Sequence, residues 1–152
     1  MELKIAGREP NSIVDGEGLR YVIFFQGCPH HCVGCHNMET WNINGGVDSS
    51  VENEINLIAK YVGHIDGITI SGGDPFFQYS VLLELVKSIK EIYSLNIWVY
   101  TGYTIEEIHK LGMIEVLDYI NVLVDGKFIL ELKSPKLPFI GSSNQRVIRI
   151  KN

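Results

Sequence analysis

The sequence predicts an α/β protein, an incomplete (partial) β/α barrel with a mostly parallel, curved sheet. Apolar segments of strand length alternate along the chain with longer segments of helical periodicity, which favours right-handed crossovers between parallel strands. The chain has 152 residues, whereas a closed eight-fold barrel takes about 250 residues. We therefore expect residues 1–152 to form a single domain whose barrel stays open on one side.

Three elements are expected in the first half of the chain. The run Arg20–Gln26 (RYVIFFQ) predicts a strand, because a short and nearly continuous apolar run is typical of a strand buried on both faces. Ser49–Val62 predicts a helix, since Ser49 and Glu52 match the capping-box pattern and apolar residues then recur every three or four positions. The recurring apolar residues are Val51, Ile55, Ile58 and Val62. A short strand, Gly67–Ser71, follows.

The second half continues the alternation. Gln78–Tyr93 predicts a helix with one apolar face, and Asn96–Tyr100 (NIWVY) predicts the next strand. Thr104–Gly112 predicts a helix that starts with a threonine, has a glutamate three residues later and ends at a glycine. Ile120–Val124 and Arg146–Ile150 are the last expected strands.

Composition excludes several classes of partner. The formal net charge is -5, which argues against direct nucleic-acid binding, because that needs clustered Lys and Arg. No apolar run approaches the roughly 20 residues of a membrane span, so no membrane contact is expected. The first residues, Met1–Lys4, lack the apolar core of a signal peptide. We expect a cytoplasmic protein.

Four polar or glycine-rich segments each follow a predicted strand. They are Cys28–Cys35, Gly72–Pro75, Thr101–Tyr103 and Asp125–Lys127. Since sites in parallel sheets form at the carboxyl ends of the strands, we expect these segments to converge on one edge. The alternative is that each is an ordinary turn, because turns are rich in Gly and Asp. That alternative carries little weight for the first segment, which holds all three cysteines of the chain.

The cysteines Cys28, Cys32 and Cys35 indicate a metal centre. Three thiolates on one loop can hold a 4Fe-4S cluster, and with only three cysteines one iron would stay open for substrate. Gly27 and Gly34 are expected to let the loop leave the strand and turn tightly. The alternative is a zinc site of three cysteines and one histidine, using His30, His31 or His36.

The spacing Cys28-x3-Cys32-x2-Cys35 resembles that of the radical S-adenosylmethionine superfamily, and Gly72–Pro75 (GGDP) resembles its glycine-rich motif, in which many members carry Glu at the position of Asp74. Within the superfamily, the chain is most similar to the activating proteins of anaerobic (class III) ribonucleotide reductase. The similarity runs from about Ser12 to Arg146. The motifs that carry it are Asp15–Gly18 (DGEG) with Arg20, Gly27–Asn37 (GCPHHCVGCHN) and Gly141–Arg146 (GSSNQR).

The resemblance implies a role for particular residues. Metal ligands would be Cys28, Cys32 and Cys35. Backbone groups near the adenine of S-adenosylmethionine would be those of Gly34, Cys35 and His36, and the methionyl end would be held by Gly72, Gly73 and Asp74. Related activators place cofactor-side polar residues near Thr101, Asp125 and Lys127.

The resemblance also implies a reaction and its partners. A 4Fe-4S cluster would give one electron to S-adenosyl-L-methionine, and the resulting 5′-deoxyadenosyl radical would take a hydrogen atom from a glycine of the large subunit of anaerobic ribonucleotide reductase. A low-potential donor such as a flavodoxin or ferredoxin would reduce the cluster. Alternatives are another glycyl-radical activator, a 7-carboxy-7-deazaguanine synthase, or a zinc module without catalysis.

Two further features are interpreted from the residues themselves. The segment Gly141–Arg146 is either a backbone nest for an anion or a turn into the last strand, with Arg146 paired to a carboxylate. Trp41 and Trp98 are expected to be packing residues.

Overall fold

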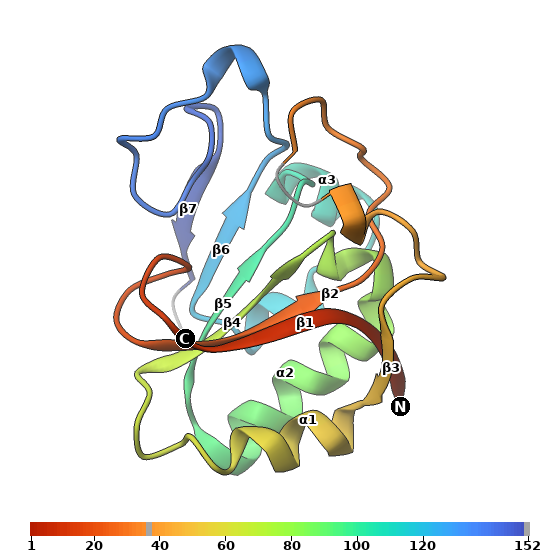
Figure 1. Ribbon diagram of the computed structural model, residues 1–152, viewed down its shortest axis with the longest axis vertical. Coiled ribbons are helices and arrows are strands. Elements are labelled where there is room, and N and C mark those ends of the chain that lie inside the picture. Colours follow the sequence, from red (N-terminus) through yellow and green to blue (C-terminus); the bar gives the residue numbers. More distant parts are fainter. Residues whose placement is uncertain (36–37, 151–152) are drawn as a thin grey trace.

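Seven strands form one sheet in the computed structural model, which describes residues 1–35 and 38–150 (Figure 1). Their order across the sheet is β3-β1-β2-β4-β5-β6-β7. The strands are β1 (Glu2–Ser12), β2 (Arg20–Phe25), β3 (Val47–Ser50), β4 (Gly67–Gly72), β5 (Asn96–Tyr100), β6 (Val122–Asp125) and β7 (Arg146–Arg149). The helices are α1 (Val51–Ile58), α2 (Tyr79–Tyr93) and α3 (Ile105–Lys110), with 3-10 turns at Met38–Thr40, Pro75–Gln78, Glu115–Asp118 and Leu130–Leu132.

The centre of the sheet is parallel. β2 pairs with β4, β4 with β5 and β5 with β6 in parallel register, which confirms the predicted α/β class. The flanking strands differ, because β1 pairs antiparallel with β2 and β3, and β7 pairs antiparallel with β6. The sheet stays open, since β3 and β7 are its two edges.

The predicted strands are confirmed to within two residues, whereas two observed strands lie in segments for which no strand is predicted. β1 contains charged residues, a glycine and a proline, and its pairing with β2 shifts register twice. β3 has only four residues. Such irregular and short edge strands lack the alternating pattern on which sequence reasoning depends.

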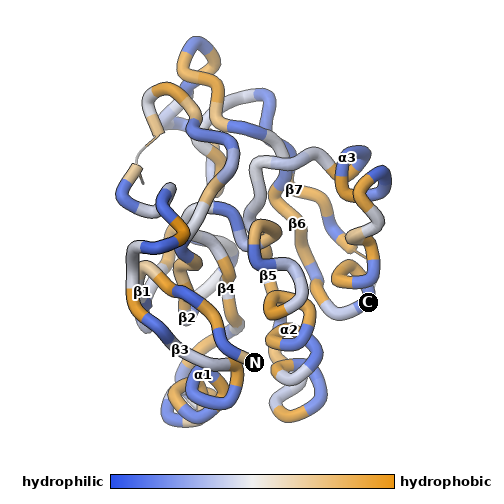
Figure 2. Tube along the Cα trace, turned by 90° about the vertical axis from the view of Figure 1, so that its right-hand side faces the viewer, coloured by the Kyte–Doolittle hydropathy of each residue, from blue (hydrophilic) through white to orange (hydrophobic). Residues whose placement is uncertain are grey.

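The helices cover one face of the sheet. Hydrophilic and hydrophobic residues alternate along α1 and α2 (Figure 2), and their apolar side chains join those of the strands in one buried cluster. The capping box at Thr104 and Glu107 of α3 is confirmed. The predicted start of the first helix is wrong, because Ser49 belongs to β3, and the N-cap is Ser50, whose side chain accepts from the backbone of Asn53.

The opposite face of the sheet carries a smaller cluster around Trp98, against which Phe139 packs edge-on. The loop Asp15–Gly18 lies against this face and is held there by Arg20. The Arg20 side chain is buried, with its guanidinium 5.5 Å from the Trp98 ring centroid. The guanidinium donates hydrogen bonds to Thr69 Oγ1 and to the Glu17 carbonyl. Burial lowers the pKa of Arg20 to about 10. The DGEG motif therefore packs against this face of the sheet through its contacts with Arg20, Thr69 and Trp98.

None of the helices within residues 1–35 and 38–150 has the length and apolar character needed to cross a membrane.

Candidate active site

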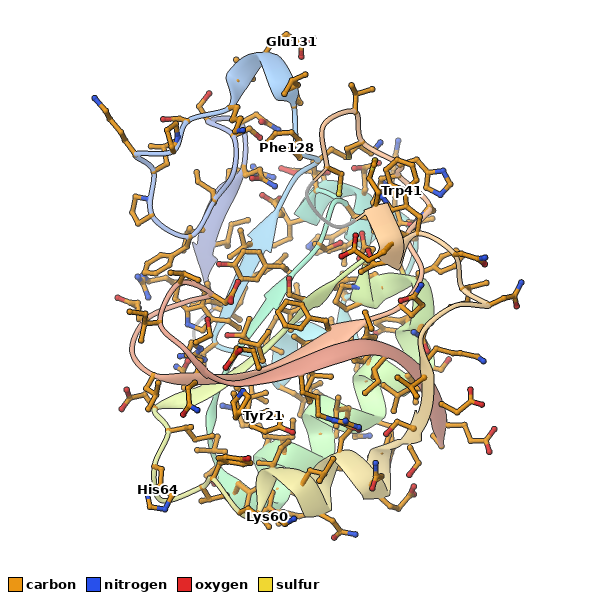
Figure 3. All side chains as sticks on the ribbon, in the orientation of Figure 1. Tyr21, Trp41, Lys60, His64, Phe128 and Glu131 are labelled. Atoms are coloured by element: carbon orange, nitrogen blue, oxygen red, sulfur yellow. The ribbon has the colours of Figure 1, made fainter. Side chains whose placement is uncertain are left out.

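One cavity of about 150 Å³ lies at the carboxyl ends of the parallel strands. All four segments that follow the predicted strands contribute to it, which confirms their expected convergence. Its lining residues are Cys28, His30, Cys32, Cys35, Trp41, Ser71, Gly72, Gly73, Tyr100, Thr101, Gly102, Gly126, Phe128 and Gln145. In Figure 3, Trp41 and Phe128 lie at the same end of the molecule, and Lys60 and His64 lie at the opposite end.

The cysteine loop leaves β2 and turns back on itself within a few residues. Gly27 and Gly34 adopt positive φ angles of 98° and 78°, a region that side chains with a Cβ rarely enter, so both predicted turning points are confirmed. The Cys35 amide donates to the Cys32 carbonyl at 3.1 Å, and the Cys28 amide donates to the Trp41 carbonyl at 3.1 Å. All three cysteines of this loop line the same cavity.

Burial and backbone amides act in opposite directions on these thiols. Burial raises the pKa of Cys28, whereas hydrogen bonds from the backbone amides of His30 and His31 lower it. Burial also raises the pKa of Cys32, and a hydrogen bond from the Phe128 amide lowers it. Amides that already point at two sulfurs would stabilise the thiolate form that a metal requires.

The carboxylate of Asp74 joins three of the loops at the carboxyl edge. It is fully buried and accepts hydrogen bonds from His30 Nε2 (2.6 Å), Thr101 Oγ1 (2.9 and 3.0 Å), the Gly102 amide (2.9 Å) and the Phe76 amide (3.0 Å). These partners follow β2, β4 and β5. Asp74 itself does not line the cavity.

The paired glycines after β4 permit close contact between strand ends. A Cβ on Gly72, whose φ is 107°, would lie 2.3 Å from the Phe25 carbonyl oxygen, and one on Gly73 would lie 2.3 Å from the Gly27 carbonyl oxygen. The Gly73 amide donates to the Phe25 carbonyl at 2.9 Å. Both glycines are required for the end of β4 to pack beside the cysteine loop.

The other residues that the sequence indicates fall in different places. Thr101 lines the cavity, whereas Asp125 and Lys127 line a neighbouring pocket. The Asp125 carboxylate is buried and pairs with Arg146 at 2.5 and 2.9 Å, so the predicted carboxylate partner of Arg146 is confirmed. Gly34 lies outside the cavity lining, and His36 lies outside the described residues.

Trp41, Tyr100 and Phe128 are aromatic residues that line the cavity without having been singled out as site residues. Trp41, expected to be a packing residue, stacks on His31 with ring centroids 4.5 Å apart, and its indole Nε1 is buried without a hydrogen-bond partner in the described chain. The buried hydroxyl of Tyr100 likewise has no hydrogen-bond partner among the described residues. Tyr100 stands directly before Thr101 at the end of a predicted strand, and this position could have identified it as a site residue from the sequence.

The donor set suits an iron–sulfur cluster. Three cysteines line one cavity, and hydrogen bonds from backbone amides lower the pKa of two of their thiols. A buried indole N–H and a buried hydroxyl in the same lining have no hydrogen-bond partner in the part of the chain that the structure describes. Within residues 1–35 and 38–150, no three side chains of His, Cys, Asp or Glu come close enough together to hold a single metal ion. His30 is one candidate for a zinc ligand, but its Nε2 is hydrogen-bonded to the Asp74 carboxylate.

Comparison with known proteins gives consistent results. The family described as "4Fe-4S single cluster domain" matches residues 14–148. The anaerobic ribonucleoside-triphosphate reductase-activating protein of Salmonella typhimurium is 45% identical over 144 residues, covering 91% of this chain and 93% of that protein. The proteins of the same name from Escherichia coli K12 and Enterobacteria phage T4 are 42% and 37% identical, covering 91% of this chain and 93% and 88% of their own length.

Among solved structures, QueE from Escherichia coli aligns with a TM-score of 0.54 at 20% identity, over 68% of this chain and 54% of QueE. That likeness concerns the fold. The sequence matches extend over nearly the whole chain and include the cysteine loop. The chain therefore belongs to the 4Fe-4S single cluster domain family and, within it, to the anaerobic ribonucleoside-triphosphate reductase-activating proteins.

Proposed function

We propose that this protein activates the large subunit of an anaerobic ribonucleoside-triphosphate reductase by generating a glycyl radical on it. The observation that carries the proposal is the single cavity shared by Cys28, Cys32, Cys35 and the glycine pair after β4. Relatives at 37–45% identity bear the name of the activating protein, which favours this partner over that of another radical enzyme.

Different residues of this cavity would bind the cluster and the cofactor. Cys28, Cys32 and Cys35 would hold a 4Fe-4S cluster, which when bound supplies one electron for cleavage of S-adenosyl-L-methionine. The backbone of Gly72 and Gly73 would hold the methionyl end, because both line the cavity. Backbone groups of Gly34, Cys35 and His36 would face the adenine.

We assign Asp74 to positioning. Its carboxylate is occupied by His30, Thr101 and two backbone amides, so it supports the binding residues from behind. Thr101 lines the cavity and is the better supported of the remaining polar candidates. Asp125 and Lys127 would act from the neighbouring pocket.

The fold supports a partner that brings its own reactive segment. We propose that the open sheet forms a partial barrel, whose uncovered side admits a glycine-bearing loop of the reductase. A flavodoxin or ferredoxin would deliver the electron, and the reducing cytoplasm would preserve the cluster.

The test is anaerobic reconstitution with iron and sulfide, followed by incubation with dithionite, S-adenosylmethionine and the reductase large subunit. We expect 5′-deoxyadenosine and a glycyl radical signal in the EPR spectrum of the large subunit. The Cys32→Ala variant should lose iron and both products together. The control Ser80→Ala, at an exposed position on α2, should retain them.

The proposal fails if the wild-type protein retains one zinc and no iron after reconstitution. It also fails for this partner if 5′-deoxyadenosine forms in the presence of the large subunit but no glycyl radical appears.

A further inference from the structure

The segment Gly141–Gln145, which the activity described above leaves without a role, forms a compact turn. Gln145 Oε1 accepts hydrogen bonds from the amides of Gly141 (2.8 Å) and Ser142 (3.1 Å), and Ser142 Oγ donates to Asn144 Oδ1 at 2.6 Å. Ser142 is fully buried. We refer to Ser142, Asn144 and Gln145 as the 142–145 brace.

The brace holds the backbone of the loop that follows β6. Gln145 Nε2 donates to the Gly126 carbonyl at 2.9 Å, and Asn144 Nδ2 donates to the Lys127 carbonyl at 2.8 Å. The Ile129 amide donates to Ser142 Oγ at 3.2 Å. Three side chains thereby fix the loop immediately before and immediately after residue 128.

Phe128, at the centre of that loop, reaches the cysteine loop. Its backbone amide is close enough to the Cys32 sulfur that hydrogen bonding from it lowers the pKa of that thiol. Its ring occupies the space beside two glycines, because a Cβ on Gly141 would lie 3.1 Å from Phe128 Cδ1 and one on Gly34 would lie 3.4 Å from Cε2. The ring is therefore held between the brace segment and the cysteine loop.

We propose that the 142–145 brace sets the reduction potential of the cluster by holding the Phe128 amide against the sulfur of Cys32. The inference deepens the proposed function and rests on it, since it takes Cys32 to be a cluster ligand. Hydrogen bonds to the ligating sulfurs are among the features that set the potential of an iron–sulfur cluster.

The direction of the effect follows from charge. Adding one electron makes the cluster more negative, and an amide hydrogen pointing at a ligating sulfur stabilises the reduced form more than the oxidised form. Releasing the Phe128 amide therefore lowers the potential and makes reduction harder. Ser142, Asn144 and Gln145 are positioning residues, because they act through Phe128.

The test compares Gln145→Met with Lys90→Met, both in anaerobically reconstituted protein. Gln145→Met preserves side-chain length and neutrality but removes the hydrogen bonds to Gly126, Gly141 and Ser142. Lys90→Met removes hydrogen bonds of comparable number, to the Leu95 carbonyl and Asn121 Oδ1, at the amino ends of β5 and β6. The measurements are the midpoint potential, the EPR spectrum of the reduced cluster, and hydrogen exchange of residues 126–133.

For Gln145→Met we expect faster exchange in residues 126–133, a more negative midpoint potential and an altered EPR spectrum, whereas Lys90→Met should leave all three unchanged. A Gln145→Met protein with a loosened loop and the wild-type potential overturns the inference, as does unchanged exchange. If Gln145→Met does not fold, Gly141→Ala serves instead, because its Cβ displaces the Phe128 ring while the brace side chains remain. An unchanged midpoint potential and an unchanged EPR spectrum in Gly141→Ala would likewise overturn the inference. Absence of any cluster in the wild-type protein would instead refute the proposed function.

Discussion

At the scale of single residues, buried polar groups decide how the site is built. Asp74 receives hydrogen bonds from loops that follow β2, β4 and β5, so one carboxylate fixes the relative positions of three cavity walls. Gly102 makes this possible, because a Cβ there would lie 2.4 Å from the His30 ring. The hydrogen bonds of Asp74 therefore depend on the close packing that Gly102 permits at this edge.

Replacing Asp74 by Asn should destabilise the protein markedly. The carboxamide would keep one acceptor oxygen and turn an NH2 group toward donors, and each buried donor left without a partner costs about 1–3 kcal/mol. For a chain of this size, each 1 kcal/mol lowers the melting temperature by roughly 2–4 °C. Urea unfolding followed by tryptophan fluorescence measures the change.

The matched control is Asp48→Asn, since the Asp48 side chain is 83% exposed in its ion pair with Lys4 and exposed pairs contribute about 0–1 kcal/mol. Equal unfolding midpoints for Asp74→Asn and Asp48→Asn would show that the Asp74 hydrogen bonds do not hold the edge together.

At the scale of elements, side-chain pairs attach α3 and β7 to the end of β6. Arg146, the first residue of β7, bonds the buried Asp125 of β6 and also the exposed Glu106 of α3, at 2.8 and 3.1 Å. Hydrogen bonds from Arg146 lower the pKa of Glu106 to about 2. The start of α3 is thus tied to the strand that precedes the site loop.

The Glu106 pair should stabilise the protein only above acid pH. A folded-state pKa near 2, below an unfolded value of about 4.3, contributes stability that is complete above about pH 5 and is lost as the pH falls from about 4 toward 2. The difference in unfolding free energy between wild type and Glu106→Gln should follow this curve in urea titrations. Repeating the comparison in an Arg146→Met background should weaken the pH dependence, because Arg146 is the largest cause of the lowered Glu106 pKa, while hydrogen bonds at the start of α3 remain. An undiminished pH dependence there would contradict the assignment.

The sequence predicts elements well where one pattern dominates. Asn96–Tyr100 is found with the predicted bounds, and the capping box of α3 is found as predicted. The first helix was predicted too long at both ends: it ends at Ile58 rather than at Val62, and Ser49 pairs with Leu3 of β1 and thereby belongs to a strand that only the folded sheet defines. The antiparallel direction of β7 could have been inferred, since no helix is predicted between the last two strands.

The site was predictable to a similar degree. The cysteine spacing and the segments after the strands identify Cys28, Gly72 and Thr101 as neighbours, which the cavity confirms. The side-chain partners of Asp74 and the approach of Phe128 to Cys32 depend on three-dimensional packing between distant segments. No local pattern carries that information.

At the scale of the whole molecule, the main apolar core and the candidate active site lie in different parts of the fold. The helices α1 and α2 cover one face and join the main apolar core, while the cavity lies at the carboxyl ends of β2, β4, β5 and β6, where the loops gather (Figure 1). Because β3 and β7 remain edges, the sheet does not enclose the site. A large partner can therefore approach it.

The most direct test of this account is the EPR spectrum of the anaerobically reconstituted, dithionite-reduced protein with and without S-adenosylmethionine. If Cys28, Cys32 and Cys35 are the three ligands that we propose, a four-iron cluster has one iron free for the cofactor, so we expect one cluster per chain and a spectrum that changes when the cofactor is added. A reduced cluster whose spectrum is identical in both samples would contradict it, because every iron would then already be held by the protein.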